Sequence, residues 1–255
     1  MKKEKAVERN FSRYAHAYDR YAEIQNIAAN ELIDYLPSGA VNKIFEIGCG
    51  TGNYTRMLQE KFPKAKITAI DISSRMIDVA VEKAYTPNTT FITSNAETAA
   101  LNDTFDIITA NAAIHWLENI VVAVEKYKNL LTENGIFAFS FFGPETFSEL
   151  GKALEDTLGG EATITAGNFL EPEKLRSVME KSFSGITTKE MIARKDYPSL
   201  LALLNNIKYT GTRGKGLDLG KPWNKGLLQR IEAAYLKRYG KIRATYQISF
   251  YKAIK

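Results

Sequence analysis

Hydrophobic and polar positions follow two different periods along this chain, and each period predicts a different kind of element. Over the first 35 residues, aromatic and aliphatic side chains recur every three or four positions, which indicates amphipathic helix. Beyond the break at Pro37-Ser38-Gly39, short apolar runs of strand length alternate with helical patterns. The predicted strands are 43–47, 66–70, 90–93, 105–110 and 136–142, and the predicted helices are 54–61, 73–83 and 120–131.

This alternation of strand and helix predicts a parallel sheet. Strands that are joined through helices form right-handed crossovers, which place helices on both faces of the sheet. After residue 142 the rhythm changes: helices are expected at 144–158, 171–182 and 199–209, and strands at 187–194 and 244–253. We therefore predict an α/β fold with a seven-stranded, mostly parallel sheet and a small helical subdomain above the strand ends, where a substrate would sit.

The composition is that of a globular protein without metal or disulfide chemistry. Of its 255 residues, 45% are hydrophobic and 25% are charged, and no apolar run approaches the roughly 20 residues that span a bilayer. The charged N-terminus lacks the apolar core of a secretory signal. A single cysteine, Cys49, excludes an internal disulfide, and only two histidines argue against a zinc site. We expect a cytoplasmic protein that holds no metal.

The basic residues are concentrated near the C-terminus, although the net charge is only +5. The segment from Asn205 to Lys255 contains 12 Lys or Arg and 2 Asp or Glu, whereas the first 204 residues contain 22 and 27. One interpretation is a basic face that is simply solvated. The other is a surface that attracts a polyanion or an acidic protein.

A glycine turn between the first strand and the next helix is the main candidate for a ligand site. Gly48, Gly50 and Gly52 form G-x-G-x-G, and Asp71 ends the next strand 21 residues after Gly50. Glycines let a ligand approach the backbone closely, and an acid at that place can accept hydrogen bonds from ribose hydroxyls. Asn53 stands where a dinucleotide site has its third glycine, and a P-loop would need Lys-Ser/Thr there. The pattern therefore favours an adenosine-containing ligand without phosphate.

The stretch from Glu46 to Gly52, EIGCGTG, closely resembles the first motif of class I S-adenosylmethionine-dependent methyltransferases. The resemblance covers about residues 40–142 and implies a Rossmann-like fold with S-adenosyl-L-methionine as cofactor. It implies that Asp71 binds the ribose, that residues 94–97 lie at the adenine, and that Asn111 lies near the methionine part. The cofactor-binding candidates are Glu46, Gly48, Cys49, Gly50, Gly52, Asp71, Ile72, Asn95, Ala96, Glu97 and Asn111.

Three longer blocks are similar to the malonyl-[acyl-carrier protein] O-methyltransferases of early biotin synthesis. They are FSRYAHAYDRYAEIQ (11–25), FFGPETFSEL (141–150) and NNIKYTGT (205–212). That family methylates the free carboxylate of a malonyl thioester, on an acyl-carrier protein or on coenzyme A. The pair His115-Trp116 also occurs in methyltransferases of small free acids such as trans-aconitate, so this alternative stays open, as does a non-catalytic module that only binds the cofactor. An RNA methyltransferase is disfavoured, because residues 111–116 lack the Asn/Asp-Pro-Pro-aromatic pattern that grips a base amine.

The resemblance divides a single domain, residues 1–255, into four segments. Residues 1–36 would form an N-terminal helical lid and 40–142 the cofactor-binding core. Residues 143–243 would form a helical insertion that caps the substrate and includes a late strand, and 244–255 would form the final strand region at the sheet edge.

Carboxyl methylation requires that the carboxylate and the methyl group are aligned, and it does not require a general base. A carboxylate with an ordinary pKa of about 4 is already ionised at pH 7, so no residue needs to remove a proton. Holding the reactants in line in a dry site supplies the rate. The candidates for gripping the malonyl carboxylate are Tyr18, His115, Trp116, Lys208, Tyr209 and Arg213. The basic C-terminal region, including Lys237, Arg238 and Lys241, would dock the acidic carrier protein.

Overall fold

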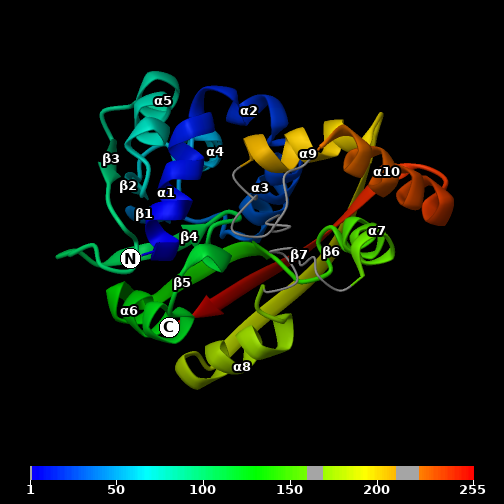
Figure 1. Ribbon diagram of the computed structural model, residues 1–255. Coiled ribbons are helices and arrows are strands. Elements are labelled where there is room, and N and C mark those ends of the chain that lie inside the picture. The colour runs from blue at the N-terminus through cyan, green and yellow to red at the C-terminus, as the bar shows by residue number, and fades with distance from the viewer. Residues whose placement is uncertain (1, 160–168, 211–223) are drawn as a thin grey trace.

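A twisted β-sheet forms the centre of the protein in the computed structural model (Figure 1). The structure describes residues 2–159, 169–210 and 224–255. Within these ranges the strands are β1 Lys43–Ile47, β2 Lys66–Asp71, β3 Thr89–Thr93, β4 Phe105–Ala110, β5 Leu131–Phe142, β6 Gly185–Tyr197 and β7 Ile242–Ile254. The seven strands are ordered β3-β2-β1-β4-β5-β7-β6, with β1 to β5 parallel to one another. The antiparallel β7 pairs with both β5 and β6, so the predicted mostly parallel sheet is confirmed.

Helices cover both faces of this sheet, as the strand patterns require. They are α1 Lys2–Tyr14, α2 Tyr18–Tyr21, α3 Glu23–Tyr35, α4 Asn53–Lys61, α5 Ser74–Ala84, α6 Ile120–Leu130, α7 Ser148–Leu158, α8 Pro172–Ser182, α9 Leu200–Tyr209 and α10 Lys225–Tyr239. Ile44 packs into one apolar core with α3, α4, α7, α9 and α10. Phe45 and Ile47, which point to the opposite face, pack into a second core with α6 and α8. The helices of the 143–243 segment are therefore divided between the two faces.

The sheet edge differs from the prediction. The final strand β7 lies inside the sheet between β5 and β6, so the expectation of an edge strand at 244–255 is wrong. The edge strand is β6, which is exposed or half-buried along its whole length, whereas nearly every residue of β7 is buried. Charged side chains on an edge strand oppose pairing with another chain, and β6 carries the charged run Arg194-Lys195-Asp196 at one end.

Two other boundaries also differ. The first 35 residues do not form one continuous helix, because a 3₁₀ turn at Ala15–Ala17 and a break at Ala22 separate α1, α2 and α3. Strand β5 begins at Leu131 rather than at residue 136, and its pairing with β4 shifts register near Asn134, which has φ 61°. Both deviations bend the chain. None of the helices in the described ranges has the length and apolarity to cross a membrane.

The bent N-terminal segment is anchored across the carboxyl ends of the parallel strands. Ser12 of α1 shares a hydrogen bond of 2.8 Å with Ser73, which caps α5. Asp19 of α2 accepts hydrogen bonds from Thr51, in the glycine turn, and from Lys83 of α5, each at 2.5 Å. These contacts place α1 and α2 over the strand ends, the side of a parallel sheet where ligands bind.

Candidate functional site

One pocket lies at the carboxyl ends of the parallel strands and is closed by the N-terminal helices. Its empty volume, including the part open to solvent, is about 930 Å³, the size of a small-molecule site. Eleven predicted site residues line it: Tyr18, Gly48, Gly50, Asp71, Ile72, Asn95, Ala96, Glu97, Asn111, His115 and Trp116. Five others do not, namely Glu46, Cys49, Gly52, Lys208 and Tyr209. Arg213 lies outside the described residues.

The glycine turn has a backbone that only glycine adopts readily. Gly48, Gly50 and Gly52 have φ values of 68°, 54° and 81°. A Cβ on Gly48 would lie 2.6 Å from the Cβ of Ala113, so this position also has no room for a side chain. A Cβ on Gly50 would meet no atom within 4 Å, and this glycine lines the pocket. The turn therefore presents bare backbone to a ligand.

Asp71 is held by the turn and by the start of the next helix. One carboxylate oxygen accepts from the Gly50 amide at 3.0 Å, and the other accepts from the Ser73 amide at 2.9 Å. Burial raises the pKa of Asp71 to about 6, while these amides act in the opposite direction. A carboxylate can accept about four hydrogen bonds. Asp71 thus keeps acceptor capacity for two hydroxyls in the pocket.

Two predicted residues lie behind the pocket wall. Glu46 is only 1% exposed, burial raises its pKa to about 8, and its Oε2 has no hydrogen-bond partner in the described part of the chain. Burial also raises the pKa of the Cys49 thiol. A buried protonated thiol is inert, so Cys49 is not in a state to act as a nucleophile.

The side chains of the loop at 94–97 are engaged in holding the loop. The Asn95 amide donates to the Glu4 carboxylate of α1 at 2.8 Å and accepts from the Glu97 backbone at 2.8 Å. The Glu97 carboxylate accepts from the backbone amides of Glu118 and Asn119, at 2.9 and 2.8 Å. The surface that this loop offers to a ligand is therefore mainly the small Ala96 and the neighbouring backbone.

At the other end of the pocket, Asn111 positions a residue that sequence reasoning missed. The Asn111 amide donates to the backbone carbonyl of Gln25 in α3 at 3.0 Å and accepts from Ser140 at 2.7 Å. Gln25 lines the pocket, is 7% exposed, and its Oε1 has no hydrogen-bond partner among the described residues. A buried acceptor without a donor is costly, so this oxygen indicates a ligand that donates here. The sequence signal that could have pointed to Gln25 is its polar side chain next to Ile24, on a helix whose other buried residues are apolar.

Aromatic rings form the wall next to this end of the pocket. The His115 ring lies 5.0 Å from Trp116, 5.5 Å from Phe142 and 4.8 Å from Phe169, measured between centroids. Phe11 of α1, which the sequence analysis did not single out, packs edge-on against Trp116 at 5.8 Å. The Nδ1 of His115 accepts from the Phe142 amide at 3.4 Å. An imidazole that accepts through Nδ1 carries its proton on Nε2, which makes His115 a neutral donor.

The remaining substrate candidates divide into two groups. Tyr18 lines the pocket, and burial raises the pKa of its hydroxyl, which therefore stays protonated as a donor. Tyr209 instead stacks on Tyr21, with centroids 4.6 Å apart, and meets the edge of Tyr14. The Lys208 ammonium lies 5.4 Å from the Tyr14 centroid. Lys208 and Tyr209 thus join α9 to the N-terminal helices rather than lining the pocket.

Known proteins resemble this chain in sequence and in fold. Residues 44–135 match the family described as a methyltransferase domain. A malonyl-[acyl-carrier protein] O-methyltransferase of Acetivibrio thermocellus is 31% identical, over 96% of this chain and 92% of the relative. The protein of that name from Halalkalibacterium halodurans is also 31% identical, over 94% of each.

Two solved structures show how widely the fold is shared. The YcgJ protein of Bacillus subtilis superposes with a TM-score of 0.63 at 15% identity, over 90% of this chain and 98% of that chain. The N-methyltransferase NodS of Bradyrhizobium japonicum, in complex with S-adenosyl-L-homocysteine, superposes with 0.53 at 12% identity, over 98% of both. At such identities the likeness concerns the fold alone, and it confirms the predicted class I architecture.

Proposed function

This chain belongs to the family of malonyl-[acyl-carrier protein] O-methyltransferases, and from that membership we propose that it methylates the free carboxylate of a malonyl thioester. The methyl donor is S-adenosyl-L-methionine, and the thioester is carried by an acyl-carrier protein. The product is the methyl ester from which pimeloyl and biotin synthesis starts. The observation that carries the proposal is that one pocket is lined both by the acceptor Asp71 and by the aromatic residues His115 and Trp116.

The residues of the pocket fit the proposed donor. Asp71 would accept hydrogen bonds from both ribose hydroxyls. Each of its carboxylate oxygens accepts one hydrogen bond from a backbone amide and can accept another. Gln25 Oε1 would accept from the ammonium group of the methionine part, which supplies the donor that this buried oxygen lacks. Ala96 leaves room for a flat base. When bound, S-adenosylmethionine supplies a methyl group on a positively charged sulfur. A carboxylate oxygen can take this methyl group, and the sulfur then leaves as the neutral thioether.

The acceptor end of the pocket fits a carboxylate that is already ionised. Neutral His115 would donate through Nε2 to one carboxylate oxygen, and the Tyr18 hydroxyl is a second possible donor. The packed rings of Phe11 and Trp116 would exclude water, which would strengthen these hydrogen bonds and favour a reaction in which opposite charges disappear. Because the carboxylate is ionised at pH 7, the reaction needs no general base, and none is assigned to these residues.

The direct test is methylation of malonyl carrier protein by the purified protein with S-adenosylmethionine, followed by intact-protein mass spectrometry. We expect the mass to rise by one methyl group in place of one hydrogen, and alkaline hydrolysis of the ester to reverse the gain. Malonyl-coenzyme A and free trans-aconitate are run in parallel. Methylation of trans-aconitate alone would move the activity to small free acids. Binding of S-adenosylhomocysteine without methylation of any acid would indicate a non-catalytic module.

A further inference from the structure

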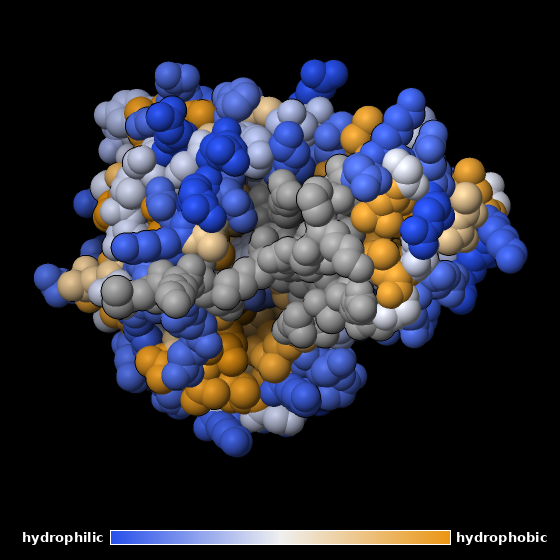
Figure 2. Space-filling model, viewed as in Figure 1, coloured by the Kyte–Doolittle hydropathy of each residue, from blue (hydrophilic) through white to orange (hydrophobic). Residues whose placement is uncertain are grey.

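A second groove lies on the outer side of α1, between α1 and α5. It is open to solvent, has an empty volume of about 1410 Å³, and four of its lining residues are cations: Lys5, Arg9, Arg13 and Arg75. Among the described residues, the acids that line it with them are Glu8 and Asp78. We call these residues the α1–α5 groove. Figure 2 shows that the surface over α1 and α5 is mainly hydrophilic.

The cations of the α1–α5 groove are not neutralised by the rest of the fold. All four are exposed. Within the described part of the chain, none of them forms an ion pair or a side-chain hydrogen bond. The carboxylate of Glu8 accepts from Ser12 at 3.2 Å instead of from Arg9. The groove therefore presents positive charge that forms no ion pair with the part of the chain that the structure describes.

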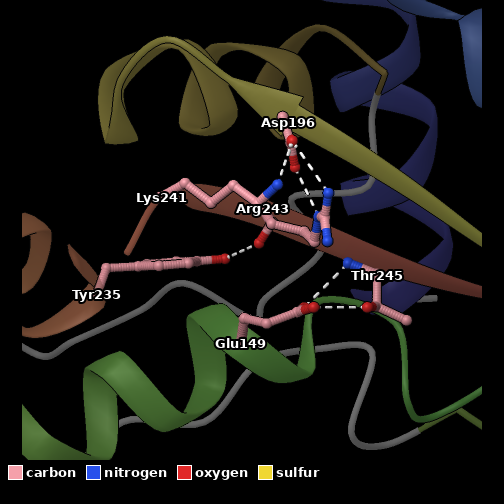
Figure 3. A network of polar contacts seen from close by, with 6 residues as sticks. All are labelled: Glu149, Asp196, Tyr235, Lys241, Arg243 and Thr245. Atoms are coloured by element: carbon pink, nitrogen blue, oxygen red, sulfur yellow. Dashed lines mark hydrogen bonds and ion pairs between the residues drawn. The ribbon is translucent and has the colours of Figure 1, made fainter. Parts of the chain in front are cut away.

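The basic C-terminal region, which the sequence favoured as a docking surface, is different. Arg238 forms two hydrogen bonds of 2.8 Å with the Asp156 carboxylate. Figure 3 shows Lys241 and Arg243 converging on Asp196, at 2.9 Å and 2.6 Å. These two cations hold the pKa of Asp196 at about 2. Three cations of this region, Arg238, Lys241 and Arg243, are thus engaged in ion pairs within the chain.

Helix α1 connects the α1–α5 groove directly to the pocket. Glu4, Val7 and Phe11, at helical spacing on one side of α1, line the pocket. Lys5 and Arg9, on the other side of the same helix, line the groove. A partner that sits in the groove would therefore contact the helix that closes the active pocket. The groove and the pocket thus share α1 as a common wall.

We propose that the α1–α5 groove is the docking surface for the acidic carrier protein. The inference rests on the proposed function, which requires an acidic protein to present its malonyl group to the pocket. Unpaired cations act over about 8 Å at physiological salt, which is enough to steer and orient an acidic partner. A cation that is paired with a carboxylate of the same chain exerts little electrostatic attraction on a partner protein. Nucleic acid and anionic membrane are the competing polyanions, and the test separates them.

The test compares two variants that change the net charge equally. Arg9→Glu with Arg13→Glu reverses the groove, and Lys225→Glu with Lys237→Glu reverses two exposed cations on α10. We expect the groove variant to lower kcat/KM for malonyl carrier protein by about tenfold or more, with a weaker dependence on salt. Turnover of malonyl-pantetheine, which has no protein part, should stay at the wild-type value. The α10 variant should keep the wild-type values for both substrates.

Three results would overturn the proposal: equal loss on both substrates, equal loss in both variants, or no loss for the carrier protein. Arg9→Gln with Arg13→Gln, together with calorimetric binding of S-adenosylhomocysteine, guards against a misfolded helix. Groove-dependent binding of an RNA oligonucleotide or of phosphatidylserine vesicles, with unchanged carrier-protein turnover, would reassign the groove. Binding of carrier protein to the wild type by fluorescence anisotropy separates this question from catalysis. If carrier protein binds through the groove but is not methylated, the proposed function fails and the docking surface stands.

Discussion

Replacing Glu46 by Gln probes the buried acid behind the glycine turn. Glu46 is 1% exposed, burial raises its pKa to about 8, and Oε2 lacks a hydrogen-bond partner among the described residues. In the unfolded chain this carboxyl ionises near its ordinary pKa of 4.5. Between these two pKa values the folded protein binds a proton that the unfolded chain has released. The free energy of unfolding should therefore fall as the pH rises from 4.5 to 8.

The size of the effect follows from the two pKa values. The interval from 4.5 to about 8, at about 1.4 kcal/mol for each pH unit, corresponds to about 5 kcal/mol. Gln keeps the shape of the side chain and has no proton to lose. We therefore expect Glu46→Gln to have nearly the stability of the wild type at pH 5 and to exceed it by up to about 5 kcal/mol at pH 8.5. Water that enters beside the ionised carboxylate would reduce this figure, so it is an upper bound.

Urea unfolding of both proteins at pH 5 and pH 8.5, at constant ionic strength, measures the difference. Ile44→Val is the matched control, because it lies on the same strand and changes no ionisable group. Its cost should be the same at both pH values. If the difference between Glu46→Gln and the wild type is also the same at both, Glu46 does not hold a proton in the folded protein, and the reasoning from its burial is wrong.

Three further predictions concern binding of S-adenosylhomocysteine, measured by calorimetry. Gly48→Ala should weaken binding and lower the free energy of unfolding by about 1–3 kcal/mol, because the new Cβ would lie 2.6 Å from the Cβ of Ala113 and φ is 68°. The control Gly185→Ala adds a Cβ where no atom lies within 4 Å, so it should change neither quantity. Asp71→Asn should weaken binding about 10- to 100-fold, since the amide cannot accept from both backbone donors and both ribose hydroxyls, and unchanged affinity would remove Asp71 from the site. Gln25→Met should weaken binding of S-adenosylhomocysteine about tenfold and leave the affinity for methylthioadenosine, which lacks the amino-acid part, unchanged. Equal losses of affinity for the two compounds would contradict the contact between Gln25 and the ammonium group.

Much of the parallel half of the sheet could be predicted from local pattern. The strands at 43–47 and 105–110 have the expected bounds, because a run of apolar residues between polar breaks suits a strand that is buried on both faces. The glycine turn and Asp71 meet at the pocket because both follow the ends of neighbouring parallel strands, β1 and β2. Asn111, which follows β4 and lines the pocket, is assigned to this site through the resemblance to class I methyltransferases.

The antiparallel edge could not be predicted in the same way. The strands β6 and β7 both alternate, and pattern alone does not say which of them pairs with β5. That choice depends on which strand the helices cover. Most of residues 242–254 are buried in the two apolar cores that helices form with the sheet, and residues 185–197 remain at the solvent edge. The charge count near the C-terminus has the same limit, since it could not show that Arg238 is paired with Asp156.

The sequence by itself determined the order of the elements, the conformation of the glycine turn and the class of ligand, since backbone sterics and side-chain periodicity act within a few residues of one another. Only the tertiary structure decided how the N-terminal helices close the pocket. It brought Gln25 to Asn111 and Phe11 to Trp116, and it gave Arg9 no ion pair with any of the described residues. Such contacts join residues about a hundred positions apart, so they depend on the packing of whole helices and strands, which no local stretch of the chain records.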